Sequence, residues 1–356
     1  MDTSHSGRVG RYGDVSSALA LLTDRQLADM VGQGQVLGSG IGGSSVRCEV
    51  VGVPVFVKRI PLSDLERRPE NVRSTANLFG LPPFCQYGVG SPGFGAWREL
   101  AANVMTTGWV LARRGEAFPL LYHWRVLPGA PPQAEEHVDV EAAVRYWGGS
   151  AAVRDRLHAL AHASTSIVLF QESIPHTLDD WLATQLTAGL DAVTSACAMV
   201  ESCLLTDVPA MNAQGLMHFD AHFGNVLTDG GRLYIADFGL ATSTRFDLSA
   251  EEAAFLRRHR THDVSYVLMR LVNWLVTNVC GIATPHDGGP IHRNEYIRAC
   301  AAGAQPVGAP PALAAMIRRY AQSTAVMNDF YWDLFGVDRA TPYPQERIER
   351  ALTAVG

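Results

Sequence analysis

The chain has 356 residues, of which 47% are hydrophobic and 18% charged, and this composition excludes a disordered polypeptide. Its net charge of -6 gives no basic surplus for nucleic acid, and its length allows two lobes, each with its own core. The six cysteines include no C-x-x-C pair, which argues against zinc and disulfides and favours a reducing, cytoplasmic environment.

The N-terminal residues carry no chemistry that we can identify. Residues 1–16 are polar, lack the apolar run of a signal peptide, and predict a flexible arm. Residues 17–31 have helical spacing, and Thr23 or Asp24 could cap a second short helix. We therefore treat residues 1–30 as an arm and helix that precede the first domain.

A glycine-rich turn between strands follows. It reads GSGIGG at residues 38–43, and residues 46–51 and 53–60 predict the next two strands. Glycines in such a turn let backbone N–H groups approach phosphates closely, although an ordinary hairpin has the same pattern. Because no helix follows the turn, it does not predict a dinucleotide-binding unit. Lys58 lies on the last of these strands.

The next part of the chain predicts a connection and a helix. Residues 61–95 are rich in Pro and Gly. A helix then runs from Trp97 to about Arg113, and Glu99 lies in its first turn, where the helix dipole favours an acid even without a partner. One apolar stripe of this helix contains Trp97, Leu100, Ala101, Val104 and Met105.

Two further strands are separated by an insertion. Residues 118–127 and 166–172 have strand composition. Residues 128–165 interrupt them with PGAPPQ and two expected helices, at 139–147 and 151–162. This insertion could recognise a substrate or a protein partner, or it could be a decoration that only packs.

Helices predominate in the rest of the chain. Thr177 is expected to cap a helix that starts at Leu178, and a long helix runs from Leu190 to about Leu205. The most apolar helical run, residues 264–279, contains Arg270 and Asn273, so we expect a buried helix and no contact with a membrane. The aromatic cluster at residues 330–335 is expected to be core.

The stretch from Met217 to Thr242 contains the residues with the strongest chemical signal. Asp220, Asn225 and Asp237 lie on either side of an expected hairpin with DGG as its turn. A hairpin of this size would return Asn225 and Asp237 to the same end, where an amide oxygen and a carboxylate suit Mg²⁺. Asp220 could then accept the proton of a hydroxyl group.

The motifs in this stretch resemble those of the protein kinase-like superfamily. His218-Phe219-Asp220 with Asn225 resembles the H-R-D-x-x-x-x-N catalytic loop, and Asp237-Phe238-Gly239 resembles the D-F-G motif. The resemblance covers about residues 31–275. It implies an α+β, bilobal fold in which residues 31–172, including the 128–165 insertion, form the N-lobe and residues 173–356 form the helical C-lobe.

The resemblance also implies a role for each candidate residue, with ATP and Mg²⁺ as cofactors. Lys58 would hold the α- and β-phosphates and Glu99 would orient Lys58. Asn225 and Asp237 would bind Mg²⁺, and Asp220 would be the catalytic base. The remaining nucleotide contacts would come from Gly38, Gly40, Gly43 and Val46, from backbone near Glu172 and Ile174, and from Leu227 beneath the adenine.

Several positions depart from the family pattern. Phe56 replaces the alanine of V-A-I-K, on the same strand face as Lys58, and its ring could stack on the adenine, swing aside or crowd the base. Phe219 replaces the arginine that receives a phosphorylated activation segment, so we do not expect that mode of activation. No A-P-E motif occurs between Asp237 and Asp263, which resembles the aspartate that anchors the catalytic loop.

The acceptor is less well defined. With His222, the loop H-x-D-x-H-x-x-N resembles aminoglycoside and choline phosphotransferases and haspin-type kinases, whereas D-F-G-L-A-T resembles protein kinases. Three hypotheses follow: a kinase for Ser or Thr in a protein or peptide, a small-molecule hydroxyl kinase, and a pseudokinase that only binds. We favour the first of these.

Overall fold

The computed structural model describes residues 2–88, 90–284 and 289–353, and its contacts divide the chain into two units. The first unit comprises residues 1–174 and 234–253, and the second comprises residues 175–233 and 254–356. The chain contains an antiparallel sheet and many helices, so it belongs to the α+β class as predicted. The predicted domain boundaries at residues 30 and 172 stay predictions.

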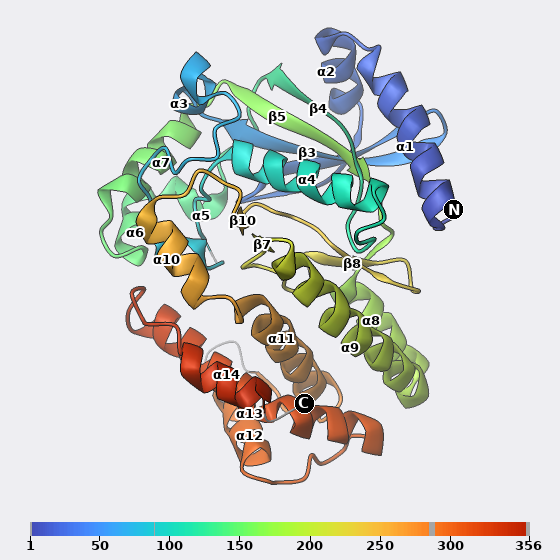
Figure 1. The fold of residues 1–356 in the computed structure, drawn as a ribbon, viewed down its shortest axis with the longest axis vertical. Coiled ribbons are helices and arrows are strands. Elements are labelled where there is room, and N and C mark those ends of the chain that lie inside the picture. Colours follow the sequence, from blue (N-terminus) through green and yellow to red (C-terminus); the bar gives the residue numbers. More distant parts are fainter. Residues whose placement is uncertain (1, 89, 285–288, 354–356) are drawn as a thin grey trace. The chain divides into compact units, whose positions relative to one another are not determined.

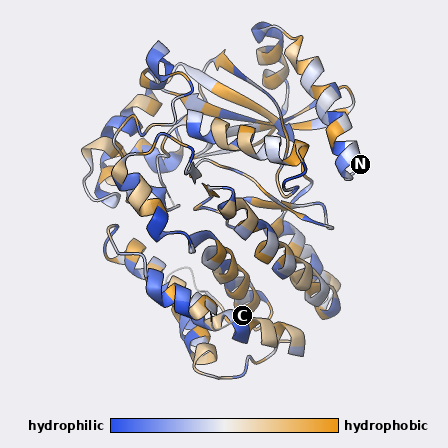
Figure 2. Ribbon diagram, in the orientation of Figure 1, coloured by the Kyte–Doolittle hydropathy of each residue, from blue (hydrophilic) through white to orange (hydrophobic). Residues whose placement is uncertain are grey.

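A five-stranded antiparallel sheet forms the centre of the first unit (Figure 1). Its strand order is β1-β2-β3-β5-β4, so β5 lies between two neighbours and is buried along nearly its whole length. This position explains its apolar sequence, and Figure 2 shows hydrophobic residues gathered along the sheet. The strands are β1 (Gln35–Gly40), β2 (Gly43–Val50), β3 (Val53–Leu62), β4 (Leu121–Pro128) and β5 (Thr165–Glu172).

The predicted glycine turn joins β1 to β2. Gly43 has a φ of +113°, and a Cβ atom at this position would lie 1.9 Å from the carbonyl oxygen of Arg59. Only glycine can therefore occupy this position, because both the backbone angle and the close approach of β3 exclude a side chain. The turn is consequently held directly against the strand that carries Lys58.

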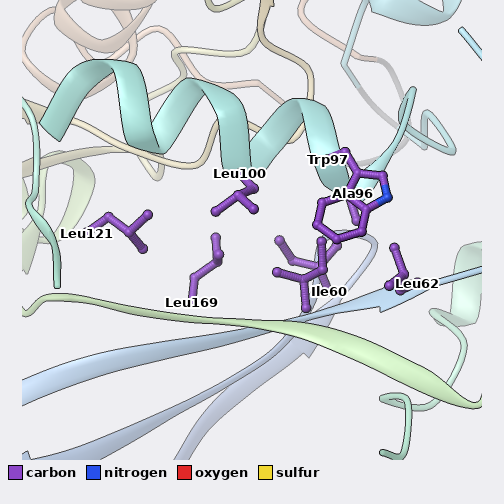
Figure 3. Close-up of a cluster of buried hydrophobic side chains, with 8 residues drawn as sticks. Ile60, Leu62, Ala96, Trp97, Leu100, Leu121 and Leu169 are labelled. Carbon is purple, nitrogen blue, oxygen red and sulfur yellow. The ribbon is translucent and has the colours of Figure 1, made fainter. Parts of the chain in front are cut away.

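Helix α4 (Ala96–Leu111) packs on one face of the sheet. Figure 3 shows Trp97 and Leu100 pointing from the helix toward Ile60 and Leu169. The predicted apolar stripe is wrong at Val104, whose exposed fraction is 43%. The cluster contains Ile60, Leu62, Ala96, Trp97, Leu100, Leu121, Ile167 and Leu169.

The buried face of α4 also contains polar residues, Asn103 and Thr107, which the predicted apolar stripe does not include. The Asn103 side chain accepts a hydrogen bond from Gln171 Nε2 at 2.6 Å, and Thr107 Oγ1 accepts one from the backbone N–H of Leu121 at 2.8 Å. Both groups are buried with their polar atoms paired. Apolar periodicity therefore does not mark these buried positions in the sequence.

The N-terminal residues form two helices, α1 (His5–Ala20) and α2 (Asp24–Gly32), which contact β2 and β4. The predicted flexible arm at residues 1–16 is therefore wrong. Ser4 caps α1, and Val15 and Leu19 on this helix are fully buried. The predicted cap at Thr23 is confirmed, because its side chain accepts the N–H of Gln26 in a capping box.

The connection between β3 and α4 packs against the 128–165 insertion. The connection contains α3 (Asp64–Arg67) and the 3₁₀ turns η1 (Pro69–Asn71) and η2 (Pro83–Gln86). The insertion contains α5 (Glu135–Val138), α6 (Val140–Tyr146) and α7 (Ala151–Ala161), so both predicted helices are confirmed. Their shared hydrophobic cluster consists of Leu81, Cys85, Phe94, Ala143, Val144, Trp147, Val153 and Leu157.

The second unit is mainly helical. Among its contacts, α11 packs against α9 and α13, and α12 packs against α13. The predicted aromatic core is correct for Phe330 but wrong for Trp332, which is 45% exposed. Its helices are α8 (Leu178–Ala188), α9 (Leu190–Ala213), α11 (His262–Asn278), α12 (Ile291–Ala301), α13 (Pro311–Gly336) and α14 (Gln345–Thr353).

Short elements complete the fold. Thr177 caps α8 as predicted, and α9 continues past the predicted end through Pro209. Within the described residues, no helix combines the length and the apolar character needed to cross a membrane. The short elements are β6 (His176–Thr177), β7 (Leu216–Met217), β8 (Val226–Thr228), β9 (Leu233–Ile235), β10 (Thr242–Ser243) and α10 (Ala250–Arg258).

Candidate active site

Lys58 lies between two carboxylates inside the first unit. Its Nζ atom is 2.7 Å from Oε1 of Glu99 and 2.7 Å from Oδ1 of Asp237. The three residues come from β3, from the first turn of α4 and from the segment that follows β9. The structure thus brings together three of the residues predicted from the motifs.

Lys58 is also the only lysine of the chain. The sequence contains 29 lysine and arginine residues, and all the others are arginine. Lysine carries its charge on a compact ammonium group, whereas the guanidinium of arginine is larger and planar. A count of lysine separately from arginine singles out Lys58 in the sequence.

The charges of this cluster depend on one another. Burial by itself would lower the pKa of Lys58, but the carboxylates of Asp237 and Glu99 outweigh this effect and raise it above the ordinary value. Burial raises the pKa of Glu99 to about 7, against the opposing effect of Lys58. Lys58 is therefore protonated at neutral pH, and Glu99 titrates in the physiological range.

Two glycines allow backbone to approach this cluster. A Cβ atom on Gly42 would lie 3.0 Å from Lys58 Nζ, and one on Gly239 would lie 3.3 Å from Asp237 Oδ1 and 3.4 Å from Glu99 Oε2. Asp237 itself has a φ of 60°, which is unusual for a residue other than glycine. The glycine turn and the D-F-G segment therefore both border the ammonium group.

The other predicted nucleotide contacts in the first unit lie on the same sheet. Gly38 and Gly40 are exposed on β1, and a Cβ atom on either would meet nothing within 4 Å. Val46 is buried on β2, and the half-buried Phe56 lies opposite Arg47 and Gln171. Their contacts with a nucleotide stay predictions.

The end of β5 is engaged by the N-terminal helix. The backbone N–H of Glu172 donates to the carbonyl of Leu120 at 2.8 Å, so only its carbonyl oxygen could meet an adenine base. Its carboxylate binds Arg8, whose Nη2 lies 2.7 Å from Oε2, and both side chains are buried. Ile174, the last residue of this part of the first unit, is half-buried, and its predicted role is untested.

In the second unit, Asp263 anchors the loop that carries Asp220. Its carboxylate accepts the backbone N–H of His218 at 2.7 Å and that of Phe219 at 2.9 Å. Burial would raise the pKa of Asp263, but His262 and His218 lower it below the ordinary value. Asp263 lies in the first turn of α11, so the start of this helix fixes the loop.

Phe219 is held in a strained conformation by aromatic packing. Its φ is 64° and its side chain is buried. The ring stacks on His262 with centroids 4.9 Å apart and contacts the rings of Phe255 and His259. An aromatic cluster of Phe255, His259 and His262 therefore surrounds Phe219.

Asp220 and Asn225 lie close together on the anchored loop. Asn225 Nδ2 donates to the backbone oxygen of Asp220 at 2.9 Å and approaches Asp220 Oδ2 at 3.4 Å. His222 also shapes the loop, because its Nδ1 accepts the N–H of Gly224 at 3.0 Å. Leu227 is half-buried on β8, where it pairs with Thr177, and its predicted contact with adenine is untested.

The oxygen atoms of this loop and of the D-F-G segment are of the type that binds Mg²⁺. The orientation of the Asn225 amide directs its nitrogen to Asp220, which leaves its oxygen as the atom for a cation. Asp237 supplies a carboxylate, and its side chain is 41% exposed. Asn225 and Asp237 belong to different units, and their shared metal site stays a prediction.

Comparison of the chain with protein-family models gives no match, and comparison with curated proteins gives no relative.

Proposed function

We propose that this chain is an ATP-dependent phosphotransferase with a bilobal, protein kinase-like fold. It transfers the γ-phosphate of ATP to a hydroxyl group, with Ser or Thr of a protein or peptide as the acceptor. The observation that carries the proposal is the ion cluster of Lys58, Glu99 and Asp237, which contains the only lysine of the chain.

Each residue has a separate role in this proposal. Lys58 binds the α- and β-phosphates, and Glu99 keeps the ammonium group in position before the nucleotide binds. Asp220 accepts or orients the attacking hydroxyl, and Asp263 holds the loop on which Asp220 lies. Asn225 and Asp237 would hold Mg²⁺, which would neutralise charge on the phosphate oxygens.

A small-molecule hydroxyl kinase is the second candidate. It is supported by His222, which occurs where protein kinases for Ser and Thr carry a lysine, and by the missing A-P-E motif. A pseudokinase that acts only as a binding module is the third, and Phe56 next to the predicted adenine position supports it.

Purified protein incubated with Mg²⁺ and γ-labelled ATP tests the proposal. We expect transfer of label to Ser- or Thr-containing peptides, and the Asp220→Asn variant should lose transfer while still binding nucleotide. Asp229→Asn is the matched control, because Asp229 lies in the adjacent turn and accepts the N–H groups of Gly231 and Arg232.

The outcomes separate the three functions. Label on aminoglycoside-like alcohols, but not on peptides, would replace the first function with the second. A shift of the melting temperature by ATP without any transfer would leave only the binding module. If the protein shows no turnover and ATP does not shift its melting temperature, all functions that use ATP are excluded.

A further inference from the structure

We propose that Arg156 and Glu66 position Glu99, so that the 128–165 insertion determines whether the ion pair of Lys58 is formed. Arg156 and Glu66 lie outside the motifs that resemble those of kinases, and their proposed role is to position another side chain. It rests on the proposed function only for its effect on catalysis. The geometric part, which links the insertion to Lys58, can be tested separately.

Glu66 supplies the N-terminal cap of α4. The helix starts after Gly95, which has no side chain and forms no side-chain cap. Oε1 of Glu66 accepts the backbone N–H of Ala96 at 2.8 Å, and the Glu66 carbonyl accepts the indole N–H of Trp97 at 2.9 Å. An anion at this place satisfies an otherwise unpaired donor and favours the positive end of the helix dipole.

The capped turn is the turn that carries Glu99. Ala96 and Trp97 directly precede Arg98 and Glu99, and the N–H of Glu99 points to the carbonyl of Gly95. A shift of this turn would move the Glu99 carboxylate, which lies 2.7 Å from Lys58 Nζ. The hydrogen bonds of Glu66 therefore act on the ion pair through less than one helical turn.

Arg156 holds Glu66 in place. Nη1 of Arg156, on α7 of the insertion, lies 2.7 Å from Glu66 Oε2, and both side chains are more than nine-tenths buried. Ser63 Oγ donates to the same oxygen at 2.6 Å, and the guanidinium lies over the ring of Phe79, 5.0 Å from its centroid. Without Arg156, the carboxylate would be buried without a countercharge and would have to move or take up a proton.

The local charges agree with this arrangement. Burial would raise the pKa of Glu66, but Arg156, Ser63 and Ala96 lower it, so Glu66 is an anion at neutral pH. A second ion pair of the insertion joins Arg154 to Glu141 at 2.7 Å, and its partners are exposed. Arg154 is two residues from Arg156 on the same helix and provides a matched control.

The only lysine of the chain makes the test direct. Reductive methylation with formaldehyde and cyanoborohydride acts on the neutral form of an amine, and Lys58 carries the only side-chain amine of the chain. We measure its methylation rate by mass spectrometry and the amide hydrogen exchange of residues 96–100. The full-length variants are Arg156→Met, Glu66→Gln and Glu99→Gln, with Arg154→Met as the control.

In Arg156→Met, we expect Lys58 to be methylated several-fold faster than in wild type, at a rate approaching that of the Glu99→Gln variant. The amide hydrogens of residues 96–100 should exchange at least tenfold faster than in wild type. Arg154→Met should behave as wild type. Because Arg156 acts through Glu66, the double variant Glu66→Gln/Arg156→Met should methylate no faster than the faster single variant.

Three results would overturn the proposal: wild-type methylation in both Arg156→Met and Glu66→Gln, faster amide exchange without faster methylation, or a Glu99→Gln variant with the wild-type rate. If Arg156→Met does not fold, Glu66→Gln decides alone, because it removes the charge that binds Arg156 and should therefore also raise the methylation rate of Lys58 above that of wild type. Neither readout requires turnover, so an inactive wild type would exclude the proposed function and leave this test intact. In an active enzyme, Arg156→Met should lower kcat and leave the KM for the acceptor unchanged.

Discussion

Glu99 and Lys58 are 41 residues apart in the chain, yet their charged atoms lie 2.7 Å apart inside the first unit. Either group buried alone would be costly, and the pair is stable only because each satisfies the other. Asp237 adds a second carboxylate to the same ammonium group. Burial of the Glu99 carboxylate, together with the Asp237 charge beside it, raises the pKa of Glu99 to about 7 and makes the protonation state of the cluster sensitive to pH near neutrality.

The first prediction concerns this pH dependence. Burial raises the pKa of Glu99 to about 7, so the carboxylate becomes ionised as the pH rises through that value. Since only the ionised form holds Lys58, we expect kcat/KM for ATP to increase over about pH 6 to 8. Glu99→Gln should lower kcat/KM at pH 8 by about 10- to 100-fold and remove this increase. Identical pH profiles of wild type and variant would contradict the assignment.

The second prediction concerns the anchor of the loop that carries Asp220. In Asp263→Asn, an amide NH₂ group would face one of the two backbone donors, which would lose its acceptor inside the protein. We expect the free energy of unfolding to fall by about 2 to 4 kcal/mol and phosphate transfer to fall with it. Urea unfolding measures the first effect, with Asp229→Asn as a control that should stay near wild type. Full stability in Asp263→Asn would show that the anchor is dispensable.

The parts of the fold that could be predicted are those with local signals. The glycine turn, the cap at Thr23 and the helices of the insertion all follow from residues that lie near one another in the sequence. The contact of Lys58 with Glu99 could be predicted only because the motifs resembled those of a known family. The roles of these residues in catalysis remain predictions.

The parts that could not be predicted depend on charged residues buried with distant partners. Arg8 and Glu172 are 164 residues apart, and Glu66 and Arg156 are 90 apart. Sequence patterns place charged residues at the surface, since their burial is favourable only with a partner that the pattern does not reveal. The N-terminal arm was therefore predicted to be flexible, and the insertion could not be connected to α4.

The third prediction tests the first of these ion pairs. Arg8 is fully buried, and it binds Glu172 together with the carbonyl groups of Glu116 and Phe118. Arg8→Met would leave the Glu172 carboxylate without its main countercharge, so we expect the free energy of unfolding to fall by about 3 to 5 kcal/mol. Chemical denaturation measures this change.

Arg25→Met is the control for Arg8. The Arg25 side chain is 92% exposed, and its ion pair with Asp29, at 3.9 Å, should contribute little to stability. The double variant Arg8→Met/Glu172→Gln removes both charges and should recover part of the lost stability. Equal stability of Arg8→Met and wild type would mean that α1 is not fastened through this residue.

The last prediction concerns acid stability in the second unit. His259 is buried, and its ring stacks on Phe255 with centroids 3.8 Å apart. Burial and the neighbouring His262 lower the pKa of His259 to about 3. The unfolded chain binds a proton below the ordinary pKa of about 6.5, whereas the folded chain resists protonation down to about 3. Stability therefore decreases as the pH falls through this window, by at most about 5 kcal/mol from this residue.

His259→Phe keeps an aromatic ring on Phe255 and removes the titrating group. Between about pH 6 and 4, we expect the free energy of unfolding of this variant to depend less on pH than that of wild type. The two slopes should differ by up to about 1.4 kcal/mol per pH unit, which corresponds to the uptake of one proton on unfolding. His292→Phe is the control, because the His292 side chain is 72% exposed and its replacement should leave the slope unchanged. Urea unfolding at a series of pH values gives these slopes. If His259→Phe and wild type have the same slope, His259 is already protonated in the folded chain, and the aromatic cluster around Phe219 must accommodate a charge.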